Sequence, residues 1–202
     1  MMKAVRSKII ALAAALPLAA FASPALAQGP SHGAATAATP AASTAPITRA
    51  EVEEAQRAWG NALVSIATEF DRNGHAAAKR LAEQVIDTAY GYQMGPVLFK
   101  PTLAAPPTTF RTDRNGALAY FVGGDSAYPG DTGFALKGWR NFEIRNAGIF
   151  LNGSSAISMG NVTVIDAQGN RTMVDKTWGY VRGPDGRLRI VLHHSSLPYQ
   201  AN

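Results

Sequence analysis

The sequence predicts an α+β domain in which helices come first and a series of antiparallel strands follows. Three observations support this class. Large apolar residues recur at three- and four-residue steps between residues 52 and 92, which is typical of amphipathic helices. From residue 97 onward the apolar residues follow a period of two, which is typical of strands with one buried face. Turn sequences separate the last of these runs, so we expect neighbouring strands to pair as hairpins.

Two helices are predicted at the start of the domain. Thr48 is followed three residues later by Glu51, which is the spacing of a capping box at a helix N-terminus. The first helical pattern runs to Asn73-Gly74, a typical helix end. A second pattern then continues and stops near Gly95-Pro96. We therefore expect one long helix and a second helix.

Seven strand-like runs follow. Turn sequences at 166–170 and 183–186 predict that the last three strands form an antiparallel meander. The expected result is a curved antiparallel sheet around the long helix, with a pocket between helix and sheet. The glycine-rich loop 123–133 is either a lid or rim of a pocket or a plain surface connection. The runs cover Val97–Lys100, Ala117–Val122, Trp139–Asn146, Gly148–Met159, Val162–Asp166, Thr172–Arg182 and Arg187–Ser195.

The N-terminus has the pattern of a secretory signal peptide. Three basic residues precede an apolar run at 9–22, and small residues end the segment at Ala27, as expected for cleavage after that residue. Residues 28–46 are mostly Ala, Thr, Pro, Gly and Ser, with no large apolar group, which predicts a flexible linker. We expect residues 47–202 to form one domain. The run is too short to span a membrane, so we expect a periplasmic or secreted protein that is not membrane-bound after cleavage.

Charge and cysteine content exclude several classes of function. Removing the leader lowers the formal net charge from +5 to +2, and no basic stretch remains, so nucleic acid is not an expected partner. Because the chain has no cysteine, disulfides, thiolate metal ligands and thiol nucleophiles are excluded.

The histidines do not predict a metal site. His32 falls in the linker and His75 at a helix start, whereas His193 and His194 point to opposite faces of one strand. One subunit therefore cannot assemble a three-histidine zinc site, and no cofactor is expected. A metal shared between subunits is the remaining alternative.

The last strand ends in the sequence His193-His194-Ser195-Ser196. Because successive strand residues point to opposite faces, His193 shares a face with Ser195, and His194 shares the other with Ser196. Each pair is a base beside a hydroxyl. No G-x-S-x-G elbow occurs, so a serine nucleophile of the hydrolase type is not expected. A shared hydrogen bond to one small polar ligand suits either pair better.

Three segments together resemble the iota-class carbonic anhydrases. They are residues 100–107 (KPTLAAPP), 119–124 (AYFVGG) and 193–199 (HHSSLPY). That family has the fold of the association domain of calcium/calmodulin-dependent kinase, one of the NTF2-like cone folds. The resemblance covers residues 47–199, and the His-His-Ser-Ser ending is its most specific part.

The resemblance implies reversible hydration of carbon dioxide to bicarbonate at a site that matches Thr102, Tyr120, His193 and Ser195. Members of the family are described both as metal-free and as metal-using, so the expectation of no cofactor comes from the count of metal ligands alone. In this interpretation His193 accepts a proton, Tyr120 and Thr102 orient the attacking water, and Ser195 binds the developing bicarbonate. Hydroxyls suit this task because each can donate one hydrogen bond and accept others.

Strand alternation conflicts with part of this assignment. Leu188, Ile190 and Leu192 make the face of His194 and Ser196 look buried, so this pair is the second choice for the substrate-binding residues. A polar pocket with arginines at its base, or a bulge near the strand end, would instead turn the face of His193 and Ser195 inward.

Two other functions fit the same fold. The first is a non-catalytic module that binds a small ligand or assembles oligomers, because fold alone does not establish catalysis. The second is an isomerase or hydratase for a larger organic substrate, which would need a carboxylate base that the strand pattern does not offer. A homodimer formed through the sheet is expected in either case.

Overall fold

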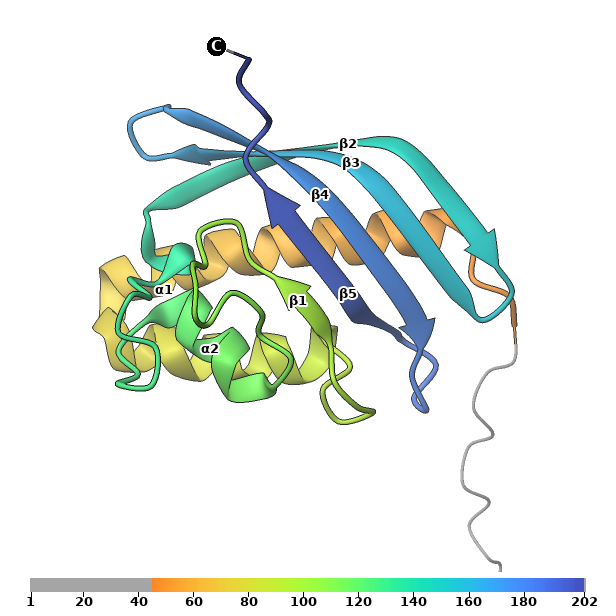
Figure 1. The fold of residues 1–202 in the computed structure, drawn as a ribbon, viewed down its shortest axis with the longest axis horizontal. Helices are drawn as coiled ribbons and strands as arrows, with labels where there is room; N and C mark the ends of the chain where they lie inside the picture. The colour runs from red at the N-terminus through yellow and green to blue at the C-terminus, as the bar shows by residue number, and fades with distance from the viewer. Residues whose placement is uncertain (1–44, 202) are drawn as a thin grey trace, which may run out of the picture. The chain divides into compact units, whose positions relative to one another are not determined.

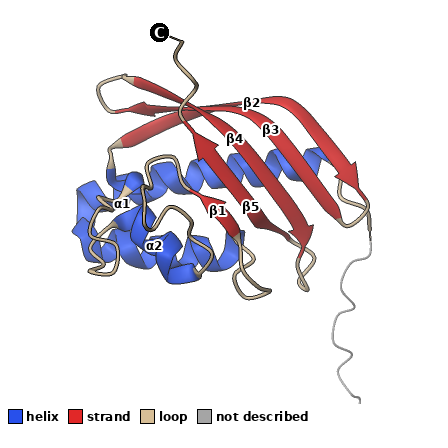
Figure 2. Ribbon diagram, viewed as in Figure 1, coloured by secondary structure: helices blue, strands red, loops and turns tan. Residues whose placement is uncertain are grey.

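The computed structural model describes residues 45–201. The predicted signal peptide (1–27) and nearly all of the predicted linker (28–46) lie outside the described residues. Helices cover one face of a curved sheet (Figures 1 and 2), which confirms the predicted α+β class. In chain order the elements are α1 (Arg49–Ala89), β1 (Leu98–Lys100), α2 (Arg114–Val122), the 3₁₀ turn η1 (Phe134–Leu136), β2 (Trp139–Asn152), β3 (Ser155–Asp166), β4 (Arg171–Arg182) and β5 (Leu188–Ser196).

The first two predicted helices form the two segments of α1. The capping box is present, since the Thr48 side chain accepts from the Glu51 amide and the Glu51 carboxylate accepts from Thr48. Gly74 interrupts the helix with a φ of 76°, a conformation that glycine adopts without steric cost. The segments fold back on each other there, so that Trp59 of the first donates to Tyr90, which follows the second. The second segment ends at Ala89, earlier than predicted.

The strands form one sheet in the order β1-β5-β4-β3-β2. The last three strands pair antiparallel, which confirms the predicted meander. The prediction of a wholly antiparallel sheet was wrong, because β1 pairs parallel to β5. The chain between them makes α2 and three further strands before β5 returns to β1, and such a long connection permits parallel pairing.

The run Ala117–Val122 was predicted as a strand and is instead part of α2. Asp113 caps this helix by accepting a hydrogen bond from the Gly116 amide at 2.8 Å. Every residue from Gly116 to Val122 is buried, and a short apolar run that is buried on all sides shows no period that separates helix from strand.

The boundary between β2 and β3 also differs from the prediction. The expected strand Gly148–Met159 runs through a hairpin turn, where Gly153 has a φ of 56°. Asn-Gly is a strong signal for such a turn, and Asn152-Gly153 therefore separates two long strands. Residues 139–152 and 155–166 form single, continuous strands with irregular pairing near residue 147.

A bulge in β5 decides which face of its end is buried. Gly179 on β4 lies opposite Leu192, whereas the next residue, Tyr180, lies opposite Ile190. Val191 is therefore an extra residue, and the alternation of side chains reverses across it. Ile190 and His193 are consequently both buried. A bulge is one of the two arrangements that the sequence allowed for an inward His193.

The loop 123–133 is tied to the domain by an ion pair. Arg111 donates to both carboxylate oxygens of Asp131 at 2.9 Å, and its guanidinium lies 4.5 Å from the centre of the Tyr128 ring. This favours the surface connection over a mobile lid. Within residues 45–201, no helix is both long and apolar enough to cross a membrane.

Candidate active site

Two hydroxyls of the predicted site lie in direct contact. Thr102 follows β1, and Ser195 lies near the end of β5, which is the neighbouring strand. Their Oγ1 and Oγ atoms are 2.5 Å apart, a short hydrogen bond between two neutral groups. Lys100 fixes the position of Ser195 by donating from Nζ to its backbone carbonyl at 3.0 Å. The parallel pairing of β1 with β5 therefore creates this hydroxyl pair.

Tyr120 reaches the hydroxyl pair from α2. Burial raises the pKa of Tyr120 to about 12, partly offset by the nearby Leu103 backbone and the Thr102 hydroxyl. Neither neighbour meets hydrogen-bond geometry, so the buried Tyr120 hydroxyl has no partner among the described residues. At neutral pH it is protonated and free to donate to a ligand oxygen.

Aromatic rings enclose Tyr120. The ring of Phe134 stacks on it with centroids 5.5 Å apart, and Phe99 and Phe121 meet it edge to face at 5.7 and 5.6 Å. These rings supply an apolar surface next to the two hydroxyls. Rings beside hydroxyls suit a small ligand that is apolar before a reaction and polar after it, or the reverse.

His193 is buried, with 1% of its surface exposed. Its ring stacks on Phe99 at 4.4 Å. Nδ1 lies 2.8 Å from the Tyr90 hydroxyl and Nε2 lies 2.8 Å from Nζ of Lys176. Burial first, and then the nearby Lys176 and His194, hold the pKa of His193 well below its usual value. The ring is therefore neutral at physiological pH.

Lys176 is a residue that the sequence reasoning missed. It lies on β4 directly opposite Ser195, is 4% exposed and sits 4.7 Å and 5.4 Å from the ring centres of Trp59 and Trp178. Burial lowers the pKa of Lys176 to about 7. The period of β4 contained a signal for it, because this lysine shares its face with the core residues Trp178 and Tyr180.

The second-choice pair lies on the other face. His194 is exposed and Ser196 is half-buried, so His194 points away from the hydroxyl pair of Thr102 and Ser195. The expectation of an inward His194 fails because the bulge at Val191 reverses the alternation. His75 is also elsewhere and contacts the Val122 carbonyl at 2.8 Å. Among the described residues, no three histidine, cysteine, aspartate or glutamate side chains cluster closely enough to hold a metal ion.

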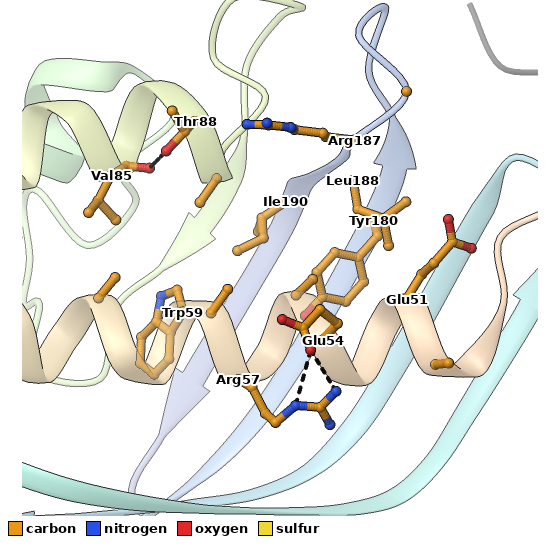
Figure 3. A pocket seen from close by; sticks show the side chains of 16 residues that line it. Glu51, Glu54, Arg57, Trp59, Val85, Thr88, Tyr180, Arg187, Leu188 and Ile190 are labelled. Carbon is orange, nitrogen blue, oxygen red and sulfur yellow. Dashed lines mark hydrogen bonds and ion pairs between the residues drawn. The ribbon is translucent and has the colours of Figure 1, made fainter.

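The expected groove between helix and sheet exists, but it does not coincide with the predicted site. A groove of about 700 Å³ lies between both segments of α1 and the β4–β5 hairpin. Figure 3 shows Trp59, Tyr180 and Ile190 around it and Arg187 near its edge. None of the four predicted site residues lines it. The hydroxyl site lies toward the opposite end of β5.

Comparisons with known proteins identify the family. The family model of metal-independent carbonic anhydrases matches residues 50–197. A metal-independent carbonic anhydrase of Nostoc sp. is 62% identical over 154 residues, which cover 76% of this chain and 75% of that protein. The crystal structure of a cyanobacterial iota-carbonic anhydrase complexed with bicarbonate has 62% identity and a TM-score of 0.77, covering 77% of this chain and 95% of that chain.

A weaker structural similarity links the chain to an NTF2-like superfamily protein from Salmonella enterica, with 14% identity and a TM-score of 0.45, covering 76% of this chain and 92% of that chain. The α+β fold is shared with the cyanobacterial iota-carbonic anhydrase, which confirms the predicted fold class. Since the family model and the Nostoc relative both match most of the chain, it belongs to the metal-independent carbonic anhydrases, the iota class.

Proposed function

We propose that this protein catalyses the reversible hydration of carbon dioxide to bicarbonate at Thr102, Tyr120, His193 and Ser195. The observation that carries the proposal is the partly buried contact between the Thr102 and Ser195 hydroxyls, 2.5 Å apart, beside the Tyr120 hydroxyl, which has no partner among the described residues. The bicarbonate in the related cyanobacterial crystal structure supports the choice of ligand.

The hydroxyl pair is the binding site for the attacking water and for one oxygen of bicarbonate. Each hydroxyl has one donor and two acceptor lone pairs, so a ligand oxygen that enters between them replaces their mutual hydrogen bond without loss. In the hydration direction, Thr102 and Ser195 accept from the water and aim its lone pair at the carbon. In the reverse direction they donate to bicarbonate.

Tyr120 and the aromatic rings hold carbon dioxide. The protonated Tyr120 hydroxyl donates to a carbon dioxide oxygen on which negative charge develops, and this interaction strengthens in the transition state. Phe99, Phe121 and Phe134, which surround the Tyr120 ring, give the apolar contact that uncharged carbon dioxide prefers.

The energetics requires water to lose its proton as it attacks. In zinc enzymes the metal lowers the pKa of bound water from about 15.7 to about 7 before the chemistry starts. Hydrogen bonds to charged groups contribute only about 1.5–3 kcal/mol each, so hydroxyls do not ionise water in advance. The C–O bond forms while an O–H bond of the water breaks, and the proton must pass to a base.

His193 is the proposed proton acceptor. It shares a face of β5 with Ser195 and is neutral because burial and Lys176 lower its pKa. General-base transfer of this kind contributes about 10²–10⁴ in rate. Both ring nitrogens are already hydrogen-bonded, to Tyr90 and Lys176, so the ring is held in one orientation.

The test is a carbon dioxide hydration assay on chelator-treated, metal-analysed protein. We expect Thr102→Val and Ser195→Ala each to lower kcat/KM by about 10–100-fold, since each removes one of the hydrogen bonds to the developing charge. Ser196→Ala, on the opposite face, is the matched control and should retain activity. Full activity in Thr102→Val and Ser195→Ala would contradict the site, and activity only with added metal would contradict the metal-independent mechanism.

We further propose that the protein is a homodimer formed through the outer face of the sheet. Four large apolar side chains are exposed there, Phe150, Ile157, Met159 and Met173, with 65%, 46%, 60% and 48% of their surface accessible. Exposed apolar side chains gathered on one face of a sheet favour an interaction surface. Sedimentation of the wild type as a dimer and of Met159→Glu as a monomer would support the interface, and a monomeric wild type would contradict it.

We also propose that the protein is periplasmic or secreted. The proposal rests on the N-terminal sequence, in which basic residues precede an apolar run that ends at Ala27. Mass spectrometry of the mature protein is expected to find Gln28 as its first residue. An intact Met1 on the protein from its native host would contradict export by this route.

A further inference from the structure

Lys176 is a buried amine that has no step of its own in the proposed reaction. Its Nζ atom contacts Nε2 of His193 at 2.8 Å and faces the rings of Trp59 and Trp178. None of the ion pairs within residues 45–201 includes Lys176. A buried ammonium without an acidic partner is costly. Its persistence next to the proposed base indicates a role in proton transfer.

Lys176 and His193 cannot both be charged. Two cations 2.8 Å apart in a buried site repel each other strongly, so the pair carries at most one extra proton and titrates as a unit. When Lys176 is an ammonium, it donates to Nε2 and His193 cannot accept a proton. When Lys176 is a neutral amine, His193 is free to do so.

The hydrogen bonds around the pair favour the neutral amine. In that state Trp59 donates to the Tyr90 hydroxyl, Tyr90 donates to Nδ1 of His193, and Nε2–H donates to Nζ of Lys176. Each of these three donors then has an acceptor, at 3.0, 2.8 and 2.8 Å respectively. With an ammonium the ring carries its hydrogen on Nδ1, and the Tyr90 hydrogen has no acceptor among these groups.

We propose that Lys176 is a positioning residue for carbon dioxide hydration, one that controls through Nε2 whether His193 can accept the proton released by the attacking water. This inference rests on the proposed function of His193. Hydration converts water and carbon dioxide into bicarbonate and one proton. The Tyr90 hydroxyl passes its proton to Nδ1 of His193 and takes up the proton released by the water, while the Nε2 proton moves to the Lys176 amine. Tyr90 and the His193 ring therefore stay neutral, and the lysine becomes an ammonium. Solvent buffer later removes this proton.

The surroundings of the pair are neutral or cationic. Tyr90, which follows α1, binds Nδ1, and burial raises its pKa well above the usual value. Lys100 on β1 binds the Ser195 carbonyl, and His194 on β5 further lowers the pKa of His193. No carboxylate is hydrogen-bonded to either member of the pair among the described residues. No group named here stabilises the ammonium form of Lys176, so its pKa stays near 7. This value suits a proton acceptor that works at neutral pH.

Two substitutions separate this role from a structural one. Lys176→Arg keeps the charge but cannot lose its proton, so His193 is blocked, and kcat/KM for hydration should fall by about 100-fold or more at every pH. Lys176→Met keeps the length and the apolar stem. In this variant the maximum kcat/KM should fall by about tenfold, because Nε2 can no longer pass its proton to an amine. The decline of kcat/KM on the acid side should move from about pH 7 to lower pH. Lys79→Met, at an exposed lysine of α1, is the control.

A second readout does not depend on activity. In ¹⁵N NMR spectra of the wild type, His193 should change from the Nδ1–H to the Nε2–H tautomer as the pH rises through about 7. This change should be missing in Lys176→Met. The readout keeps the inference testable even where Lys176→Arg fails to fold.

The outcomes distinguish the two proposals. A fully active His193→Ala would show that His193 is not the general base, independent of the results for the Lys176 variants. An inactive His193→Ala combined with a Lys176→Met enzyme of wild-type pH profile and tautomer behaviour would overturn the inference about Lys176 alone. Wild-type kcat/KM in Lys176→Arg would overturn it as well.

Discussion

Two polar clusters lie between α1 and the sheet, and they differ in whether their groups can gain or lose a proton. The amide cluster consists of Gln56, Asn146 and Ser158. The Gln56 and Asn146 amides donate to each other at 2.9 and 2.8 Å, and the Gln56 amide also lies 3.0 Å from the Ser158 hydroxyl. All three groups are uncharged, so this cluster has the same hydrogen bonds at any ordinary pH.

The histidine cluster consists of Tyr90, His193 and Lys176. All three members are buried, whereas Asn146 of the amide cluster is partly exposed. The contacts of the histidine cluster are equally short, and each of its members can gain or lose a proton. Burial acts on the two clusters in the same way but has different results. In the amide cluster it strengthens neutral hydrogen bonds. In the histidine cluster it lowers the pKa of a lysine and a histidine toward or below neutrality, which is costly for stability and useful for proton transfer.

The largest difference between the clusters is expected in activity. His193→Ala should lower kcat/KM for hydration by about 10²–10⁴, because the general base is lost. His194→Ala, one residue away on the exposed face, should leave it nearly unchanged. Stopped-flow assays of both variants with a pH indicator test this. Equal losses in the two variants would mean that the buried position of His193 does not determine its role.

The next effect is a loss of stability without a loss of chemistry. Gln56→Leu has a similar volume but removes the amide, leaving Asn146 and Ser158 without these partners. The free energy of unfolding should fall by about 1–3 kcal/mol. Urea denaturation followed by circular dichroism measures this. The kcat/KM of the folded variant should stay within about twofold of wild type, and a loss comparable to that of His193→Ala would show that the amide cluster also serves catalysis.

A third effect is a pH dependence of stability, which the histidine cluster produces and the amide cluster does not. The pKa of Lys176 is about 7 when folded, against a reference value of 10.5. Between these pH values the unfolded chain binds the extra proton, so the free energy of unfolding rises with pH. Relative to Lys176→Met, wild type should gain at most about 1.36 kcal/mol per pH unit in this window. Below about pH 7 the difference should be constant.

Gln56→Leu provides the comparison for this measurement. Its stability difference from wild type should not change with pH, because no member of the amide cluster titrates. If the free energies of unfolding of wild type and Lys176→Met changed with pH in parallel across this window, folding would not lower the pKa of the buried amine.

Much of the fold follows from local pattern. The capping box at Thr48, the break at Gly74 and the hairpins of the last three strands are decided by residues close in sequence, and all three predictions are confirmed. The segment that became α2 was predicted wrongly because burial on every side removes the period that distinguishes the two secondary structures. The parallel pairing of β1 with β5 joins residues about ninety positions apart, which no local pattern records.

The candidate site divides in the same way. Strand alternation alone placed His193 with Ser195, and His194 with Ser196, on opposite faces. Thr102 and Tyr120 were predicted only through the resemblance to a family. Lys176 was not predicted at all, although its position among Val174, Trp178 and Tyr180 in an apolar alternation marked it as a buried cation.

By itself, the sequence determined that a histidine and a hydroxyl would stand side by side at the end of the last strand, because the pleat of a strand repeats every two residues. Only the tertiary structure decided which histidine is buried. One extra residue at Val191, allowed by the close approach of Gly179 to Leu192, reverses the alternation. The same strand pairing sets Lys176 opposite Ser195. Register depends on the neighbouring strands, so it brings together groups whose chemistry the linear sequence keeps apart.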